Sequence, residues 1–185
     1  HERAHTYTHH TYVCAHTARD SFDPTRSAKQ AYTGKDMVSS DGAKALGHSA
    51  FYPVVGTLAV SSGRHRWAIK ADGDNEIFMG LVADDVDVGT DWTGNKRCWG
   101  VYLDGRGMHF AGQRQERSEG PARFNVPCEV TVVVDCDAGT MSFGVEGQME
   151  LQVVCESLPK NAALRFGCAT IDSSCKLKMV AYKSL

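Results

Sequence analysis

The sequence lacks any run of about 18 consecutive apolar residues, the length that a membrane-spanning helix requires. Its first twenty residues also lack the apolar core of a secretory signal. An excess of charge of one sign is missing too: 20 Lys and Arg stand against 22 Asp and Glu, for a formal net charge of −2. This balance disfavours partners that are bound by neutralising phosphates. We therefore expect no nucleic acid and no membrane as a partner.

Closely spaced cysteines are absent as well. The seven cysteines are never closer than seven residues, which excludes a C-x-x-C metal or redox motif. Several continue the apolar phase of strand-like segments, as Cys136 does after Val134 and Cys168 does after Phe166. Such positions predict reduced thiols in a core, with a disulfide or a reactive thiol as the alternative. Reduced thiols imply an intracellular protein.

Helical periodicity is also absent, because no ten-residue window has a clear apolar face at the i, i+3, i+4, i+7 spacing of a helix. Strict alternation recurs instead, the signature of strands with one face in a core. Trp67, Ile69 and Ala71 alternate in this way, and Leu151, Val153 and Cys155 repeat the pattern, whereas segment 77–82 is apolar throughout and predicts a strand buried on both faces. The final strand is expected over 175–182.

Turn-forming residues separate these segments. Asp-Gly and Glu-Gly pairs such as Asp72-Gly73 and Glu146-Gly147 supply the positive φ that tight turns need. Asp137-Ala138-Gly139 predicts a hairpin between strands over 130–136 and 141–145, and segment 114–122 reads as an exposed loop. Valines outnumber leucines eighteen to nine, and glycines number 18 in 185 residues. The pattern favours an all-β, two-layer antiparallel β-sandwich with little or no helix.

Catalytic signatures are missing. The run Gly47-His48-Ser49-Ala50-Phe51 begins like a G-x-S-x-G nucleophile elbow but ends in phenylalanine, and no P-loop or H-E-x-x-H motif occurs. Glu129, Glu146 and Glu150 could be paired glycosidase carboxylates, although solvated acids are the simpler interpretation. We expect a protein that is not an enzyme and that carries no cofactor.

Two segments carry side chains of the kinds that bind metal ions. Asp84, Asp85, Asp87 and Asp91 form an acidic loop that could bind calcium or a basic partner, yet the EF-hand spacing fails and a solvated loop is favoured. Imidazole and thiolate groups crowd the segment 1–20, whose irregular spacing favours incidental metal affinity over a zinc or copper site. The expectation is no bound metal.

With the strands in place, the motifs from Phe22 to Tyr182 resemble those of the SPRY (B30.2-like, PRY-SPRY) domain family. The segment 61–70, SSGRHRWAIK, resembles the family's Gly-basic-His-Tyr-Trp-Glu-Val-Glu strand with the tryptophan kept and both glutamates replaced. The segment 132–143, VVVDCDAGTMSF, is similar to the hallmark Leu-Asp-Tyr-Glu-x-Gly-x-Leu-Ser-Phe hairpin. Further similarities are CWGVY at 98–102, SLP at 157–159, LRFG at 164–167, and FDP at 22–24 with MVSSDG at 37–42 as a PRY-like start.

The resemblance implies a bent, concanavalin-like β-sandwich over residues 21–185, preceded by a His/Thr-rich extension at 1–20. It also implies a monomeric, noncatalytic module whose rim loops bind a peptide segment of another protein, in a docking or scaffolding role. Trp92 stands in a turn-rich loop, where it is either an exposed binding anchor or a loop-packing residue. The predicted binding residues are Trp92, Asp84, Asp85, Asp87, Thr90, Asp91, His48, Phe51, Tyr52, Gly147, Gln148, Ile171, Asp172 and Ser173. The alternative function is a lectin that stacks sugars on tryptophan.

Overall fold

The computed structural model describes residues 20–27, 37–38, 51–73, 76–105, 107–115, 123–171 and 174–185. Its strands are β1 (Met37–Val38), β2 (Val54–Val60), β3 (Arg64–Asp72), β4 (Ile77–Ala83), β5 (Cys98–Tyr102), β6 (Met108–Phe110), β7 (Gln113–Gln115), β8 (Cys128–Asp135), β9 (Thr140–Val145), β10 (Met149–Cys155), β11 (Leu164–Thr170) and β12 (Lys176–Ser184). Within these described residues the only helix is one 3-10 turn, η1 (Trp92–Gly94). None of the described residues forms a helix long and apolar enough to cross a membrane.

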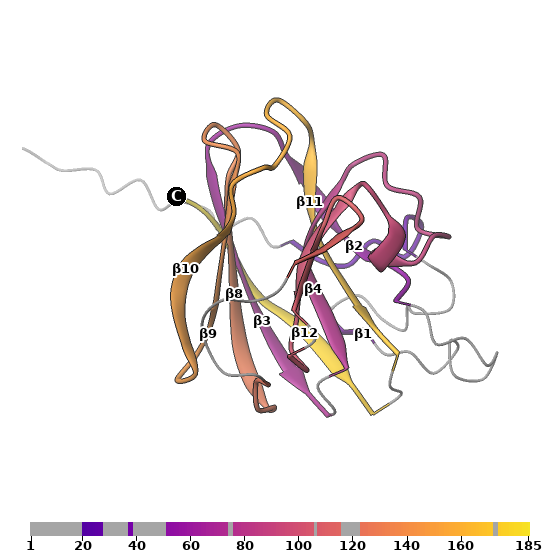
Figure 1. Ribbon diagram of the computed structural model, residues 1–185, viewed down its shortest axis with the longest axis vertical. Coiled ribbons are helices and arrows are strands. Elements are labelled where there is room, and N and C mark those ends of the chain that lie inside the picture. The colour runs from indigo at the N-terminus through magenta and orange to yellow at the C-terminus, as the bar shows by residue number, and fades with distance from the viewer. Residues whose placement is uncertain are drawn as a thin grey trace, which may run out of the picture.

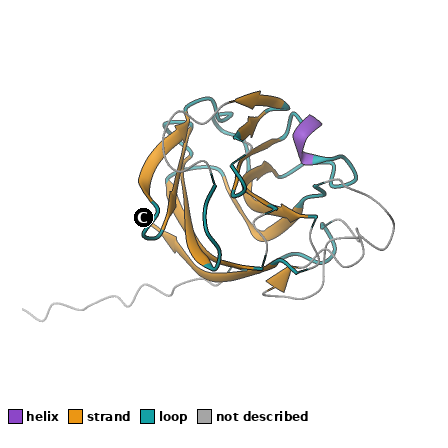
Figure 2. Ribbon diagram, turned by 60° about the horizontal axis from the view of Figure 1, so that its bottom comes forward, coloured by secondary structure: helices purple, strands orange, loops and turns teal. Residues whose placement is uncertain are grey.

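The strands form two six-stranded sheets that pack face to face (Figure 1). Sheet 1 has the order β1-β12-β3-β8-β9-β10, and sheet 2 has the order β2-β11-β4-β5-β6-β7. All their strand pairs are antiparallel. A view turned by 60° shows the layers with almost no helical structure (Figure 2). The predicted all-β sandwich is confirmed.

Alternating residues of both sheets meet in one hydrophobic core. Trp67 and Ile69 of β3 and Phe143 of β9 point inward from sheet 1, and Leu81 of β4 and Phe166 of β11 meet them from sheet 2, all buried. The Trp67 and Phe166 rings lie 6.2 Å apart between centroids. Because the side-chain period of a strand is two, Arg66 and Lys70, on the opposite face of β3, point to solvent.

A second hydrophobic cluster covers the other face of sheet 2. Phe78 and Val82 of β4 point away from the main core and pack with Phe51, Trp92 and Tyr102. Every residue of β4 is therefore buried, as the uninterrupted apolar run predicts. The segment 84–97, which carries η1, crosses this face and closes it from solvent.

The β8–β9 hairpin follows the sequence expectation. Asp135 pairs with Thr140, and the turn between them is closed by Gly139 at φ +75°. Only glycine adopts that backbone region at no steric cost. A Cβ at this position would also approach the carbonyl oxygen of Leu158 to 3.0 Å, so the turn needs glycine on two grounds.

Two sequence expectations were wrong in detail. Leu151 and Val153 are 50% and 52% exposed, whereas Cys155 is buried. Register shifts in β10 on both sides of Gln152–Val153 change which face the alternating residues present. Gln113–Gln115, partly assigned to a loop, pairs with β6 as the edge strand β7.

A buried carboxylate fixes the start of the described chain to the sandwich. Asp20 is 7% exposed, and its side chain accepts hydrogen bonds from Trp67 Nε1 at 2.8 Å, Thr57 Oγ1 at 2.9 Å and the Leu58 backbone N–H at 3.0 Å. The same carboxylate also accepts a hydrogen bond from the Ser21 backbone N–H at 2.8 Å. Asp20 is therefore bonded to both β2 and β3.

None of the six cysteines that the structure describes forms a disulfide. Five are buried and Cys128 is half-buried, whereas Cys14 lies outside the described residues. Burial raises the pKa of the Cys128 and Cys136 thiols to about 11, and it raises the pKa of Cys98 and Cys168 further. These cysteines are neutral thiols in hydrophobic surroundings, as their positions in the strand pattern predict.

Candidate functional site

The loop 84–97 carries six of the fourteen predicted binding residues, and Trp92 holds it against sheet 2. The Trp92 side chain is fully buried, with its ring 4.6 Å from that of Phe78 between centroids. Its backbone N–H donates to the carbonyl oxygen of Phe51 at 2.8 Å. The expectation of an exposed aromatic anchor at this position was wrong, and loop packing, the other interpretation, is what the structure shows.

Asp91 fixes the two segments to each other. Its carboxylate accepts from the backbone N–H and the hydroxyl of Thr93 at 2.7 and 2.5 Å, which caps η1. The other carboxylate oxygen accepts from the Phe51 N–H at 2.7 Å. His109 adds a further contact, because its Nδ1 donates to the Thr93 carbonyl oxygen at 3.1 Å. Asp91 is thus a structural link between the loop and the chain at residue 51.

The remaining acidic residues of the loop are also held within the domain. Asp84 accepts from Arg165 Nε at 2.5 Å and forms an ion pair with Arg26 at 3.0 Å. Asp85 forms an ion pair with Arg97. The hydrogen bond from Arg97 lowers the pKa of Asp85 below its ordinary value.

Asp87 organises its own turn. It accepts from the Gly89 backbone N–H at 2.9 Å and from the Thr90 hydroxyl at 2.7 Å. The Thr90 hydrogen bond, followed by that of Gly89, lowers the pKa of Asp87. The acidic loop is therefore a set of bonded carboxylates. Across the described part of the chain, no group of three or more His, Cys, Asp or Glu side chains is placed to hold a metal ion.

The other predicted rim residues divide into two places. Phe51 and Ile171 join Trp92 in the second hydrophobic cluster, and Tyr52 packs against the main core. Asp84 follows β4 and Ile171 follows β11, so they lie at opposite ends of sheet 2, because Leu164 pairs with Ala83 and Thr170 pairs with Ile77. His48, Asp172 and Ser173 lie outside the described residues.

Gly147 and Gln148 form the turn between β9 and β10 at one end of sheet 1. Gly147 has φ +68°, with open space where a Cβ would stand. The Gln148 side chain is clasped to Asn125: its Nε2 donates to the Asn125 carbonyl oxygen at 2.8 Å, and its Oε1 accepts from the Asn125 N–H at 2.5 Å. This turn is consequently held in one orientation.

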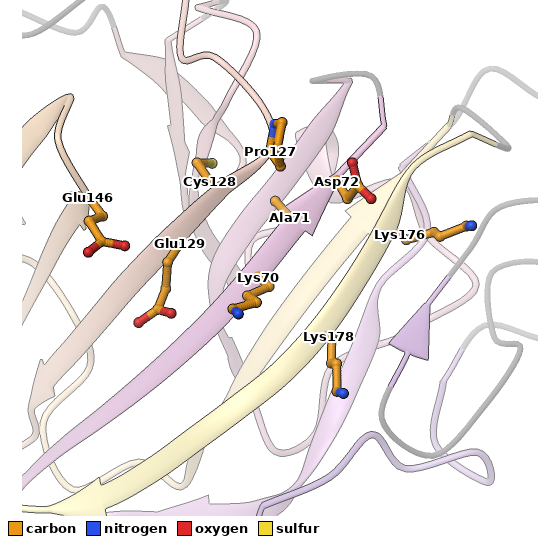
Figure 3. A pocket seen from close by; sticks show the side chains of 9 residues that line it. All are labelled: Lys70, Ala71, Asp72, Pro127, Cys128, Glu129, Glu146, Lys176 and Lys178. Carbon is orange, nitrogen blue, oxygen red and sulfur yellow. The ribbon is translucent and has the colours of Figure 1, made fainter.

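Beside that turn, the outer face of sheet 1 is hollowed. We name this depression of about 520 Å³ the Lys/Glu hollow (Figure 3). It is lined by Lys70, Ala71, Asp72, Pro127, Cys128, Glu129, Glu146, Lys176 and Lys178. A second depression, lined by residues 145–150, shares Glu146 with it and includes the predicted residues Gly147 and Gln148. Glu146 lines both depressions, so they are neighbours at this end of sheet 1.

Charge in the Lys/Glu hollow is divided between its two sides. Lys70 on β3 and Lys176 and Lys178 on β12 lie on one side, and Glu129 on β8 and Glu146 after β9 lie on the other (Figure 3). Asp72 lies among the lysines and is bonded to the Gly73 N–H at 2.8 Å. The three lysines were not among the residues predicted from the sequence. They could have been found as the exposed positions that alternate with buried core residues along β3 and β12.

Comparison with known proteins places this architecture in a family. A family model of the SPRY domain matches residues 64–183. The chain belongs to the SPRY domain family. SPRY domains are protein-interaction modules and are generally noncatalytic. A comparison of the sequence with curated proteins gives no match.

Solved structures with this fold include several SPRY domains. The SPRY domain of human HERC1 superimposes with a TM-score of 0.66 at 18% identity, over 86% of this chain and 97% of that one. The PSpry domain of TRIM65 gives 0.66 at 15% identity, over 88% and 90%. Stonustoxin also gives 0.66, at 16% identity, over 88% of this SPRY domain but 27% of the toxin chain. At these identities the likeness establishes the fold.

Proposed function

We propose that this SPRY domain binds an extended peptide segment of a partner protein, as a noncatalytic docking or scaffolding unit. The observation that supports this most directly is the open Lys/Glu hollow, which continues along the β9–β10 turn. An open depression lined by charged side chains on a rigid sheet suits a polypeptide that lies across the surface. The thiols of the described residues, none of which is in a disulfide, support a reducing, intracellular setting.

The proposed surface is centred on sheet 1. Gly147 and Gln148 lie at its margin, and the Gln148–Asn125 clasp gives a partner a fixed boundary. In the loop 84–97, the exposed side chains of Asp85, Asp87 and Thr90 remain predictions for contact, as do His48, Asp172 and Ser173.

The lectin alternative loses its main support. That hypothesis required an exposed tryptophan on which a sugar ring could stack. All three tryptophans of the chain, Trp67, Trp92 and Trp99, are buried. We therefore rank peptide binding above carbohydrate binding.

The test is a selection from a random twelve-residue peptide library on the immobilised 185-residue chain, with a glycan array in parallel. Peptide binding predicts enriched sequences whose synthetic copies bind reversibly in calorimetry. The absence of any enriched binder would overturn the proposal, and binding confined to the glycan array would replace it with the lectin function. A heat-unfolded sample is the control for nonspecific capture.

A further inference from the structure

We infer that the Lys/Glu hollow selects a peptide segment that carries an acidic and a basic side chain about two strand spacings apart. The inference rests on the proposed function and specifies its partner by charge. The acidic side chain would lie over Lys70 and Lys178, and the basic side chain over Glu129 and Glu146.

Strand register fixes the positions of these charges. Lys178 of β12 lies directly opposite Lys70 of β3, and Lys70 lies directly opposite Glu129 of β8. Each of the three alternates with an inward-facing core residue, so their side chains leave the same outer face of sheet 1 (Figure 3). Directly opposed residues of neighbouring strands hold their Cβ atoms about 4.5–5.5 Å apart, and like charges there are destabilising.

Lys70 thus lies between the like charge of Lys178 and the opposite charge of Glu129. Among the described residues, the lysines at 70, 176 and 178 and the glutamates at 129 and 146 form no ion pair and no side-chain hydrogen bond. The other end of the same sheet face differs, because Arg64 lies opposite Asp135 and pairs with it at 3.6 Å. An acidic group bound between Lys70 and Lys178 would therefore contact two lysines without competing with an existing ion pair.

The separation of the two charge groups sets the peptide spacing. Strands in a sheet lie about 4.8 Å apart, so the midpoint of β12 and β3 and the midpoint of β8 and β9 are roughly 9.6 Å apart. An extended chain advances about 3.3 Å per residue, which puts side chains two to four residues apart within reach of both groups. The expected segment crosses the strands with its acidic residue above β3–β12.

A second copy of this chain is the competing occupant, since a surface with both charges can complement itself about a two-fold axis. The shape argues against it. Two copies would bring one hollow against the other, whereas an extended segment can enter a depression of about 520 Å³. We therefore commit to a peptide, and self-association becomes an outcome of the test.

The decisive experiment exchanges the two charge groups. A peptide selected on the wild-type domain is compared with a version whose acidic and basic residues are interchanged, by fluorescence anisotropy. The variants are Lys70→Gln with Lys178→Gln, Glu129→Gln with Glu146→Gln, and the full swap in which both lysines become Glu and both glutamates become Lys. Lys183→Gln, on the same strand β12 but outside the hollow, is the matched control. Thermal melts confirm that each variant is folded.

Each neutralised pair should weaken binding of the selected peptide by on the order of tenfold, with a reduced salt dependence, because a charged contact is lost. The full swap should prefer the interchanged peptide, and Lys183→Gln should bind like wild type. If peptides bind but neither neutralised pair changes their affinity, the inference fails while the proposed function stands. If no peptide binds, both fail. A wild-type dimer in light scattering that these variants dissociate would also overturn the inference, in favour of self-association.

Discussion

The indole of Trp92 rests directly on Gly167, in β11. A Cβ at position 167 would lie 2.8 Å from Trp92 Cη2 and 2.7 Å from Val82 Cγ1. The indole can therefore approach β11 this closely only because Gly167 presents no side chain. Glycine in a strand weakens it in isolation, and here the close approach of the indole explains its presence.

Gly167→Ala should lower the free energy of unfolding by about 1–3 kcal/mol, because an added methyl group overpacks the contact. Trp92→Ala should cost about 3–5 kcal/mol through the cavity it leaves. The two losses should be non-additive, since each variant removes the contact that the other disturbs. Urea denaturation measures all three proteins. Gly94→Ala is the control, because nothing lies within 4 Å of its Cβ position; equal effects at Gly94 and Gly167 would contradict the argument.

Asp20→Asn should destabilise the domain by about 1–3 kcal/mol, since the new amide places donors among four donor groups. The change preserves size, so packing is not the cause. The matched control is Asp137→Asn, an exposed carboxylate that accepts only from the Gly63 N–H, at 3.1 Å. Chemical denaturation with tryptophan fluorescence compares them, and similar midpoints for the two variants would refute the role of Asp20.

His109 should make the domain less stable in mild acid. Burial, chiefly, and Arg114 lower its pKa below the ordinary value, while the Thr93 carbonyl and Asp91 oppose that shift. Near pH 6 the unfolded chain consequently binds more protons than the folded one, so the free energy of unfolding rises with pH. The stability that the neutral His109 contributes is fully present above the ordinary pKa of about 6.5, and it is lost as the pH falls through the lower pKa of the folded state. The melting temperature of wild type should fall more than that of His109→Gln between about pH 7.5 and 5.5; a parallel fall would count against this assignment.

The thiols of the described residues should react slowly. Cys128 and Cys136, with pKa values raised to about 11, have about a hundredfold less thiolate at neutral pH than a thiol of ordinary pKa. Titration with a thiol-specific disulfide reagent should give one fast equivalent at most, which Cys14→Ser should abolish. Denaturant should release the remaining six. Rapid reaction of the folded Cys14→Ser protein would disprove their burial.

A variant of the acidic loop tests whether a peptide binds at the loop 84–97 or at the Lys/Glu hollow. The triple change of Asp84, Asp85 and Asp87 to Asn removes carboxylates that bond to Arg165, Arg97 and Thr90. It should lower the melting temperature, because those partners lose their acceptors, and binding at the Lys/Glu hollow alone would leave the affinity of a peptide selected on the wild type unchanged. A salt-dependent loss of that affinity in the folded variant would instead locate binding at this loop.

The fold was predictable because its signals are local. A strand with one buried face follows from the alternation of Trp67, Ile69 and Ala71, and a tight turn follows from Gly139. The apolar run at 77–82 predicts a strand that is buried on both faces. The faces of Leu151 and Val153 were not predictable, since a bulge reverses the phase without changing the pattern of residue types.

The site was less accessible from sequence for a different reason. Trp92 in a polar, turn-rich segment looks exposed until the fold brings Phe78 and Gly167 beneath it. Lys70 and Lys178 are more than a hundred residues apart, and only the order of strands in sheet 1 makes them neighbours. Long-range register of this kind depends on the assembled sheet, not on any local stretch.

The place of β12 bears on how the protein is made. This strand, the last of the described strands in sequence order, lies inside sheet 1 between β1 and β3 rather than at an edge. During synthesis, β3 therefore lacks its hydrogen-bonding partner on one side until residues 176–184 leave the ribosome. Trp67 lacks its contact with Tyr182 over the same period. Such an intermediate exposes an unpaired strand edge, which promotes aggregation with other polypeptides and is the kind of surface that chaperones bind.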